Sequence, residues 1–299
     1  MGALQRSRIR LAIALISPAA IIMLTVTVYP LVQSLYMSVV KWNLMRPQSI
    51  GTFVGLDNYV FVLGDPRFWR SVAITLEFTA IAVALEISLG VLIAVMLNRE
   101  FPGRAWVRML ALLPWAIPPV VNGVLWKWIL NPRYGALNGL LLDLGIIKSP
   151  DDYIIWLGTP QLALLMVVLA DVWKETPFIV LLMLAALQTI PRTLYEAARV
   201  DGAGRVRTLI HITLPLIAPT LFVAVSLRTI WALKSFDLIY TLTAGGPSDG
   251  TTVIGYYTYL LSFVSLDMGR GAASAYLMTI AVMGIVLLYQ RLLYREVRY

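Results

Sequence analysis

Cysteine is absent from the 299-residue chain, and histidine occurs only once, as His211. Without cysteine there is no disulfide, no thiolate nucleophile and no cysteine-bound metal. A single histidine argues against a histidine metal cluster and against a serine–histidine catalytic triad. The sequence contains neither GxxxxGK followed by Ser or Thr nor HExxH, the motifs of phosphate-binding loops and zinc hydrolases. These absences leave the chain without a recognisable catalytic centre of its own.

Charged side chains are also scarce, at 13% of residues, whereas hydrophobic residues make up 59% and the mean hydropathy is +0.79. A soluble domain carries about 25% charged residues because its surface must be hydrated. The chain is therefore predicted to be an integral membrane protein. Its net charge of +8 fits the lysines and arginines that cytoplasmic membrane loops need, so we expect a lipid membrane and no nucleic acid as partner.

Six apolar stretches are long enough, at about 20 residues, to cross the hydrocarbon core as helices. In chain order they lie within Leu11–Val40, Val72–Leu97, Val107–Leu130, Gln161–Leu187, Leu216–Leu238 and Ala273–Leu293. The runs are continuous, which favours helices over alternating barrel strands. The first run is too long for a signal peptide. We predict an all-α protein with a tail over residues 1–10 and a six-helix transmembrane domain over residues 11–299.

Prolines within these stretches are expected to kink or break the helices that contain them. They are Pro30, Pro114, Pro118, Pro119 and Pro177. The longest connection, Asn131–Pro160, lies outside the predicted spans and is expected to hold a short helix or two.

Basic residues are distributed unequally between the two sides of the predicted bundle. The two tails and the loops after spans two and four hold thirteen basic and four acidic residues, against nine basic and eight acidic residues on the opposite side. An excess of lysine and arginine marks the cytoplasmic side. Both termini are therefore predicted to be cytoplasmic.

The cytoplasmic loop between spans four and five, residues 190–215, holds the most specific pattern in the chain. Thr193 and Glu196 have the spacing of a capping box, which predicts the start of a helix. Gly202 suits the left-handed residue that ends such a helix, and a second short helix is expected over Ala203–Ile210. On local physics alone, a helical hairpin that merely links two spans remains an alternative.

Four elements of this loop resemble the EAA motif of ABC importer permeases. They are Glu196-Ala197-Ala198, Gly202 after three further residues, Ile212 after nine more, and Leu214-Pro215. The resemblance implies that the loop forms a coupling helix that docks on a cytoplasmic ATPase subunit. The residues that it assigns to coupling are Glu196, Ala197, Ala198, Asp201, Gly202, Leu214 and Pro215.

Further motifs resemble carbohydrate permeases of the maltose and glycerol-3-phosphate (MalF- and UgpA-like) type, with a trehalose-type permease among the candidates. They are Val54–Tyr59, Leu113-Pro114-Trp115 with Trp126, Trp173-Lys174, and Phe236–Thr243 with Gly245-Gly246-Pro247. The resemblance implies the type I ABC importer (MetI-like) permease fold in a prokaryotic inner or plasma membrane. It also implies a second six-helix permease subunit, two cytoplasmic ATPase subunits that bind ATP and magnesium, and an extracytoplasmic substrate-binding protein. The chain itself is expected to hold no cofactor and no metal and not to be an enzyme.

Charged residues near the middle of the predicted spans are the candidate substrate pathway. A charge at this depth costs at least about 2.5–3.5 kcal/mol unless it is paired or hydrated. Asp171, Lys174 and Glu175 share one face of span four, and Arg228 lies at a similar depth in span five. We expect Asp171 to pair with Lys174 and Arg228 to pair with Glu175. Either these residues hold the bundle together or they line a hydrated cavity, and their concentration at one depth favours the cavity.

Sugars are bound by polar groups together with flat aromatic rings, which this region also contains. The predicted pathway residues are Asn122, Trp126, Asp171, Lys174, Glu175, Arg228, Trp231 and Asp237. In span two, Glu77 and Glu86 are expected to form buried pairs.

These features together predict a permease subunit of an ATP-driven, binding-protein-dependent importer of a carbohydrate. The substrate is expected to be a di- or oligosaccharide such as trehalose or maltodextrin, with a glycerol phosphate ester as an alternative. A secondary transporter or channel subunit that needs no ATPase would suit the intramembrane charges but not the loop motif. An intramembrane enzyme is disfavoured because no nucleophile lies in a pattern with a base.

Overall fold

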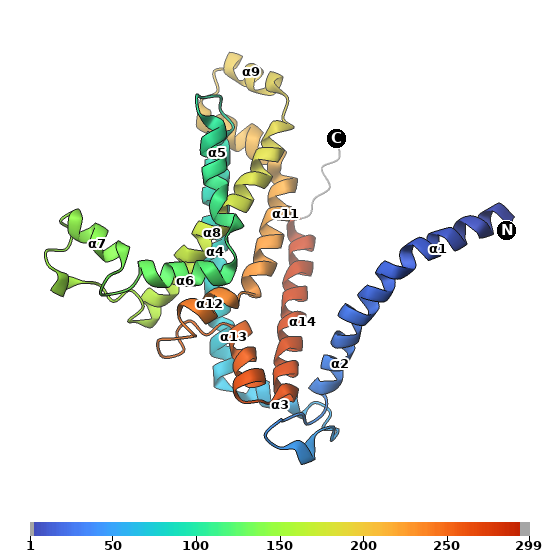
Figure 1. Ribbon diagram of the computed structural model, residues 1–299. Coiled ribbons are helices and arrows are strands. Elements are labelled where there is room, and N and C mark those ends of the chain that lie inside the picture. Colours follow the sequence, from blue (N-terminus) through green and yellow to red (C-terminus); the bar gives the residue numbers. More distant parts are fainter. Residues whose placement is uncertain (1–2, 294–299) are drawn as a thin grey trace. The chain divides into compact units, whose positions relative to one another are not determined.

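A computed structural model describes residues 3–293, and every regular element among them is a helix (Figure 1). Apart from the helices, this part of the chain contains two isolated antiparallel β-bridges, Val40–Phe53 and Asn43–Asp267. The all-α class predicted from the sequence is therefore confirmed. Arg295 and Arg298, which contribute to the charge of the C-terminal tail, lie outside the described residues.

The chain divides into two compact units, and the first comprises the residues up to Pro66 together with Thr258–Thr279. Its helices are α1 (Ala3–Met23), the π-helix η1 (Leu24–Val28), α2 (Tyr29–Ser38), the 3-10 helix η2 (Pro47–Ser49), α3 (Asp57–Gly64), the π-helix η6 (Leu260–Val264) and the beginning of α14 (Met268–Leu293). Asn58 in α3 donates from Nδ2 to the carbonyl oxygens of Ser38 and Val40, each at 2.9 Å. This amide fixes the turn that follows α2.

The second unit comprises Arg67–Tyr257 and the chain from Ile280 onward. Its α-helices are α4 (Pro66–Leu97), α5 (Arg104–Leu112), α6 (Pro119–Ile129), α7 (Ala136–Asp143), α8 (Pro160–Gln188), α9 (Arg192–Val200), α10 (Arg205–Thr208), α11 (Leu214–Leu233), α12 (Asp237–Leu242) and most of α13 (Ile254–Tyr259). It also contains the 3-10 helices η3 (Leu113–Ala116) and η4 (Pro150–Asp152) and the π-helix η5 (Leu209–Thr213). The short helices α7 and η4 confirm the expectation for the connection Asn131–Pro160.

The core of the second unit is the packing of α4, α8 and α11. Ala94 of α4, Ile179 and Met183 of α8, and Ala224 of α11 are fully buried against one another. Gly90 allows the closest approach, because a Cβ at this position would lie 2.5 Å from Cγ2 of Ile179. The three helices that carry most of the predicted mid-depth charges therefore form one packed group.

Four helical stretches have the length and composition to cross a membrane. They are Leu11–Ser38, Pro66–Leu97, Arg205–Leu233 and Met268–Tyr289, and the bent pair Arg104–Ala116 with Pro119–Ile129 would make a fifth. The remaining predicted span corresponds to α8, which is 29 residues long but contains Asp171, Lys174 and Glu175 near its middle. Its charges thus distinguish it from a simple apolar span.

Two predicted spans differ from the observed helices. Span three is not one helix over Val107–Leu130, because the chain bends by 99° between Ala116 and Pro119, where successive prolines end the helical hydrogen bonding. Span five ends at Leu233 rather than Leu238, and a separate helix begins at Asp237. The short helix expected over Ala203–Ile210 is instead the start of a longer helical run, Arg205–Leu233.

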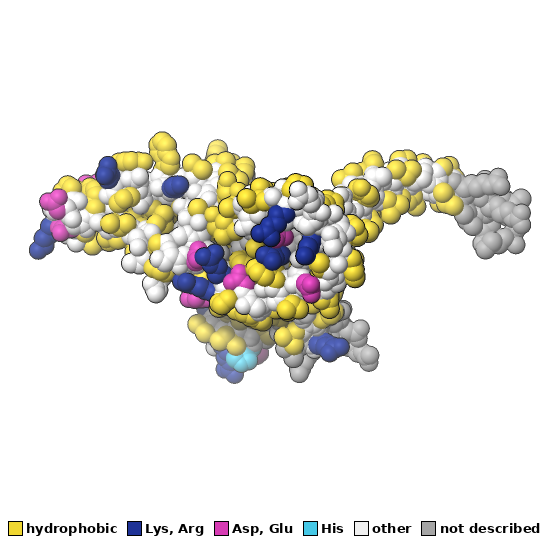
Figure 2. Space-filling model, turned by 90° about the horizontal axis from the view of Figure 1, so that it is seen from below, with side chains coloured by type: hydrophobic (Ala, Val, Ile, Leu, Met, Phe, Trp, Pro, Cys, Tyr) yellow, Lys and Arg dark blue, Asp and Glu magenta, His cyan; other side chains and the backbone are white. Residues whose placement is uncertain are grey.

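Hydrophobic side chains cover much of the described surface, and charged side chains form small groups among them (Figure 2). Leu15 and Val26 in the first span are 72% and 69% exposed, and Leu92 in α4 is 55% exposed. Such extensive apolar exposure is stable where lipid or a partner protein, rather than water, surrounds the helices. The exposed side chains agree with the membrane location predicted from composition.

Candidate functional site

The loop with the EAA-like motif folds as α9, which lies at one end of the second unit (Figure 1). The helix begins at Arg192, directly after Pro191, and no side chain caps its first turn. The capping box predicted for Thr193 and Glu196 is therefore wrong. Pro191 precedes the first helical residue, so Thr193 lies inside the first turn rather than at its boundary.

Gly202 ends α9 in the left-handed conformation, with φ +71°, as the sequence predicted. The N–H of Ala203 donates to the carbonyl of Ala198 at 2.8 Å, and the N–H of Gly202 donates to the carbonyl of Arg199 at 3.1 Å. This pair of hydrogen bonds is a Schellman motif. A Cβ at Gly202 would have nothing within 4 Å, so the backbone conformation, not crowding within this chain, requires glycine here.

Two side-chain contacts hold α9 against the rest of the second unit. The hydroxyl groups of Tyr195 and Thr213 lie 3.3 Å apart, and Arg192 bonds Glu100 in the loop after α4 at 2.9 Å. Thr213 directly precedes Leu214 and Pro215, so the Tyr195 contact joins the two halves of the motif. Neither Tyr195 nor Thr213 could be selected from the sequence, because a hydroxyl contact between distant residues produces no periodic pattern.

The coupling residues present an exposed surface. Glu196, Ala197, Asp201, Gly202 and Pro215 are exposed, Leu214 is half-buried and Ala198 is buried. Two large apolar residues of α9 are also exposed, Leu194 at 40% and Val200 at 88%. An apolar and small-residue surface beside a carboxylate is suited to close packing against another protein.

A buried ionic cluster joins α4, α8 and α11. Arg228 of α11 forms two hydrogen bonds with Glu86 of α4, at 2.5 Å from Nε and 2.6 Å from Nη2, and a third with Asp171 of α8 at 2.7 Å. Lys174 and Glu175, both in α8, pair with each other at 2.6 Å. Arg228 is 2% exposed and Glu86 is fully buried. The fork of the guanidinium matches a carboxylate with two parallel bonds, which strengthens the pair.

Two pairings predicted from the sequence are wrong, and so is the predicted burial of Glu77. Arg228 bonds Glu86 and Asp171 rather than Glu175, and Lys174 bonds Glu175 rather than Asp171. The sequence placed Glu175 opposite Arg228 from depth alone, whereas helix packing brings Glu86 into that position. The buried pairing predicted for Glu86 is confirmed, but Glu77 is exposed.

The other predicted pathway residues lie in two places. Asn122, which is fully buried, and the half-buried Trp126 share one face of α6, and Trp126 lies 6.2 Å from Trp173 of α8, measured between ring centroids. Trp231 of α11 packs at 4.9 Å against Phe178, a residue of α8 that the sequence interpretation did not select. Asp237 is exposed at the first turn of α12 and belongs to neither group.

Polar atoms in this region lack hydrogen-bond partners. Among the described residues, Asn122 Oδ1, Trp126 Nε1 and Thr176 Oγ1 are buried without a partner. The amide nitrogen of Asn122 donates to the carbonyl of Ala170 at 3.2 Å, which fixes the side chain and leaves its oxygen free. Buried polar atoms are nearly always satisfied in folded proteins, so these atoms are candidates for a polar partner, such as water or a ligand, that the described residues do not supply.

Replacement of Arg228 tests the role of the buried cluster. Arg228→Gln leaves Glu86 and Asp171 without their cation, and breaking a buried pair costs about 3–5 kcal/mol. We expect a markedly lower thermal unfolding temperature in detergent, measured by size exclusion after heating. Lys234→Gln, which removes an exposed cation just after α11, is the matched control and should be neutral.

A triple variant separates loss of charge balance from loss of packing at the same site. Arg228→Gln combined with Glu86→Gln and Asp171→Asn leaves no unpaired charge in the cluster and should recover much of the unfolding temperature. Equal unfolding temperatures for Arg228→Gln and Lys234→Gln would show that the cluster does not stabilise the helix packing.

Comparison with known proteins identifies the family. The sequence profile of the binding-protein-dependent transport system inner membrane component matches residues 86–299. The chain is 40% identical over 281 residues to the trehalose/maltose transport system permease protein MalF of Thermococcus litoralis, covering 94% of this chain and 92% of that protein. It is 37% identical over 283 residues to the trehalose transport system permease protein SugA of Mycobacterium tuberculosis, covering 95% and 88% of the two chains.

The fold also matches a solved transporter. A chain of a bacterial alginate ABC transporter, in complex with a periplasmic protein that binds alginate pentasaccharide, superposes with a TM-score of 0.81 at 26% identity, over 95% of this chain and 94% of that one. The curated relatives are permease proteins, that is, transport components without catalytic activity, which agrees with the motifs that the sequence lacks. From these similarities in sequence and fold, the chain belongs to the family of binding-protein-dependent transport system inner membrane components.

Proposed function

We propose that this chain is a permease subunit of an ATP-driven importer of a di- or oligosaccharide and forms half of the translocation pathway. The observation that carries the proposal is the exposed α9, with its motif residues on the surface and its glycine in the left-handed conformation. The relatives named for trehalose, maltose and alginate transport support a carbohydrate as the substrate. They also favour an importer over the alternative of a transporter that needs no ATPase.

The partners of the proposed importer are those that the resemblance to ABC importer permeases implies. A second six-helix permease subunit completes the pathway, and two cytoplasmic ATPase subunits bind ATP and magnesium and receive α9. An extracytoplasmic binding protein delivers the sugar. The apolar sides of the helices provide surface for the second permease and for lipid.

The contacts of α9 provide a route from the ATPase to the membrane helices. Tyr195 holds α9 to Thr213, which is continuous with α11 in the helical run Arg205–Leu233. Arg228 in the same run bonds Glu86 of α4 and Asp171 of α8. A displacement of α9 therefore acts on three helices that are joined by buried charge, and a packed, ion-paired group moves as a unit. We infer that ATP-driven movement of α9 opens the pathway by shifting this group.

Two variants at Gly202 test the coupling role. Valine in the left-handed region is strongly disfavoured, whereas asparagine of similar size adopts it more readily. We expect Gly202→Val to reduce sugar uptake into cells at least tenfold, because α9 can no longer end in the conformation that it has here. Gly202→Asn should retain most uptake.

Membrane amounts of this chain and of the ATPase, measured by immunoblot, serve as the control for assembly. Normal uptake by Gly202→Val would contradict the assignment of α9 as the coupling helix.

The polar face of α6 is the proposed sugar contact. Asn122 Oδ1 offers an acceptor and Trp126 Nε1 offers a donor, and neither has a partner among the described residues. The two residues are four apart on one helix and therefore point in similar directions. The rings of Trp126 and Trp173 add flat apolar surface. A hydroxyl group of a sugar donates to Asn122 Oδ1 or accepts from Trp126 Nε1. The apolar C–H face of the sugar ring packs on an indole ring.

Replacement of Trp126 tests this contact. Trp126→Phe retains an aromatic ring but removes the N–H, so we expect sugar uptake to fall about tenfold through the loss of one buried hydrogen bond. Uptake of radiolabelled trehalose and maltose is measured at several concentrations. Trp128→Phe on the same helix, where the side chain is 67% exposed, is the matched control and should transport normally. Equal uptake by the two variants would exclude Trp126 from the pathway.

The proposed orientation places α9 and both termini in the cytoplasm of a prokaryotic cell, with the chain in its inner or plasma membrane. The contact between Arg192 and Glu100 supports this arrangement, because it brings the loops after spans two and four to the same end of the second unit. Both loops are rich in arginine, as cytoplasmic loops are.

Single cysteines test the orientation without background, since the native chain has none. Cysteines at Gly103 and Gly204, in the two basic loops, should resist an impermeant thiol reagent in intact cells. A cysteine at Ser248 should react, because it lies in a loop on the opposite side. Labelling of Gly204→Cys in intact cells, with Ser248→Cys protected, would reverse the orientation.

A further inference from the structure

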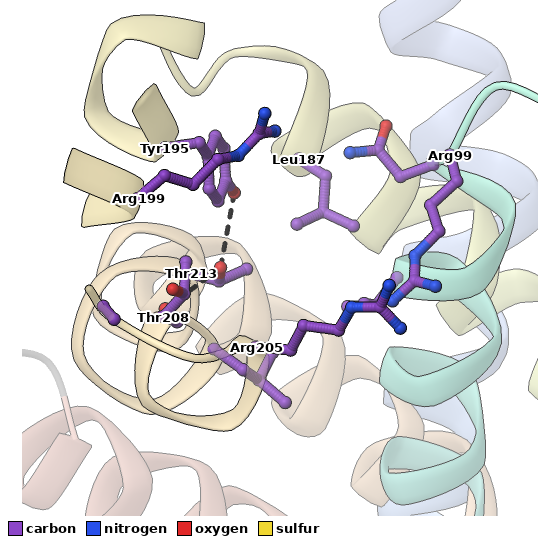
Figure 3. Close-up of a pocket in the computed structure, with 11 residues that line it drawn as sticks. Arg99, Leu187, Tyr195, Arg199, Arg205, Thr208 and Thr213 are labelled. Atoms are coloured by element: carbon purple, nitrogen blue, oxygen red, sulfur yellow. Dashed lines mark hydrogen bonds between the residues drawn. The ribbon is translucent and has the colours of Figure 1, made fainter. Parts of the chain in front are cut away.

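A pocket of about 500 Å³ lies beside α9, within the second unit (Figure 3). Its walls come from the ends of α4 and α8, from α9 and from the beginning of the helical run that contains α10. The hydrogen bond between Tyr195 and Thr213 crosses one wall of the pocket. The pocket is therefore part of the structure that positions α9.

Three arginines line this pocket, and none of the lining residues in the described part of the chain is acidic. They are Arg99 after α4, Arg199 on α9 and Arg205 on α10. Figure 3 shows their side chains placed around the hollow, with the guanidinium groups of Arg99 and Arg205 directed to the same side. Among the residues that the structure describes, the ion pairs involve other side chains, and these three arginines enter none of them.

Neutral hydrogen-bonding groups complete the lining. Asn98, Thr208 and Thr213 carry amide and hydroxyl groups, and Tyr195 adds a phenol. The three arginines are exposed, so water screens their mutual repulsion, but an anion that enters the hollow meets several guanidinium forks, which match phosphate oxygens. The volume of the pocket exceeds that of a bare phosphate ion. The amide and hydroxyl groups would therefore contact a hydroxyl-bearing group that is esterified to the phosphate.

We propose that this pocket binds a phosphate ester of a small polyol and thereby controls the position of α9. The chemistry is shared by two sources, a soluble phosphorylated polyol and the headgroup of phosphatidylglycerol. A bound phosphate bridges Arg199 of α9 to Arg99, which follows α4, and to Arg205 at the start of the run that continues into α11, so occupancy fixes α9 against these two helices. The control of transport rests on the proposed role of α9, whereas the binding of phosphate does not.

Direct binding tests the site in the assembled transporter, purified through a tag on this chain. Glycerol 3-phosphate is titrated by calorimetry, with glycerol as the uncharged control. In parallel, the transporter is placed in nanodiscs of phosphatidylcholine with or without phosphatidylglycerol, and retained lipid is measured by native mass spectrometry. We expect saturable binding of glycerol 3-phosphate, selective retention of phosphatidylglycerol, or both, and the probe that binds identifies the source.

Two substitutions away from α9 connect binding to the pocket. Arg99→Gln and Arg205→Gln each remove a charged donor and should weaken binding about tenfold, because each loses a charge-assisted hydrogen bond to the phosphate. Arg207→Gln is the matched control, because Arg207 is exposed on the same helical turn but does not line the pocket. Its affinity should remain within about twofold of the unmodified transporter.

The proposal is overturned if neither probe binds, or if Arg207→Gln weakens binding as much as Arg99→Gln and Arg205→Gln do. It is also overturned if these two variants release the ATPase on gel filtration while the unmodified transporter binds no phosphate probe, since the arginines would then hold carboxylates of a partner. Failure of binding leaves the coupling role of α9 intact. Conversely, normal uptake by Gly202→Val would remove that role without affecting phosphate binding.

Discussion

The bond between Arg228 and two carboxylates is the interaction on which the helix packing of the second unit depends. Glu86, Asp171 and Arg228 come from three different helices and are nearly or fully buried. Neither a lone arginine nor a lone carboxylate is tolerated in such surroundings, so each helix requires the other two. The close approach of Gly90 to Ile179 and the ionic bonds of Arg228 together fix how the three helices are rotated against one another.

Because of this constraint, movement of the short helix α9 can affect all three of the helices α4, α8 and α11. Its nine residues are attached by the hydroxyl contact of Tyr195, by the exposed ion pair of Arg192, and by packing of Tyr195 against the core of the second unit. The run that continues into α11, however, is tied to α4 and α8 by buried charge. A displacement of α9 by a partner is therefore passed to the ion-paired group of three helices. The arginine-lined pocket lies between α9 and the start of the run that continues into α11.

The helical class, the extent of α8 and the left-handed Gly202 could be predicted, because they depend on local composition and backbone preference. The pairing of Arg228 could not, because depth along a helix does not determine its rotation or its neighbours. The break before Pro119 was indicated by proline, but its 99° angle depends on tertiary packing. Helix α9 began earlier than the Thr193–Glu196 pattern suggested, since Pro191 favours an earlier start.

The break between η3 and α6 has a consequence for how the bilayer meets this chain. Ile117 and Pro118 are extended, and the 11 residues of α6 reach only about 16 Å, roughly half of the hydrocarbon thickness. Main-chain carbonyl groups freed at such a bend are not stable against acyl chains. The bend must therefore be shielded from lipid tails by protein or reached by water. Helix α8 supplies part of this shield, since Trp115 of η3 stacks on Phe178, so the protein itself keeps acyl chains away from this stretch of main chain.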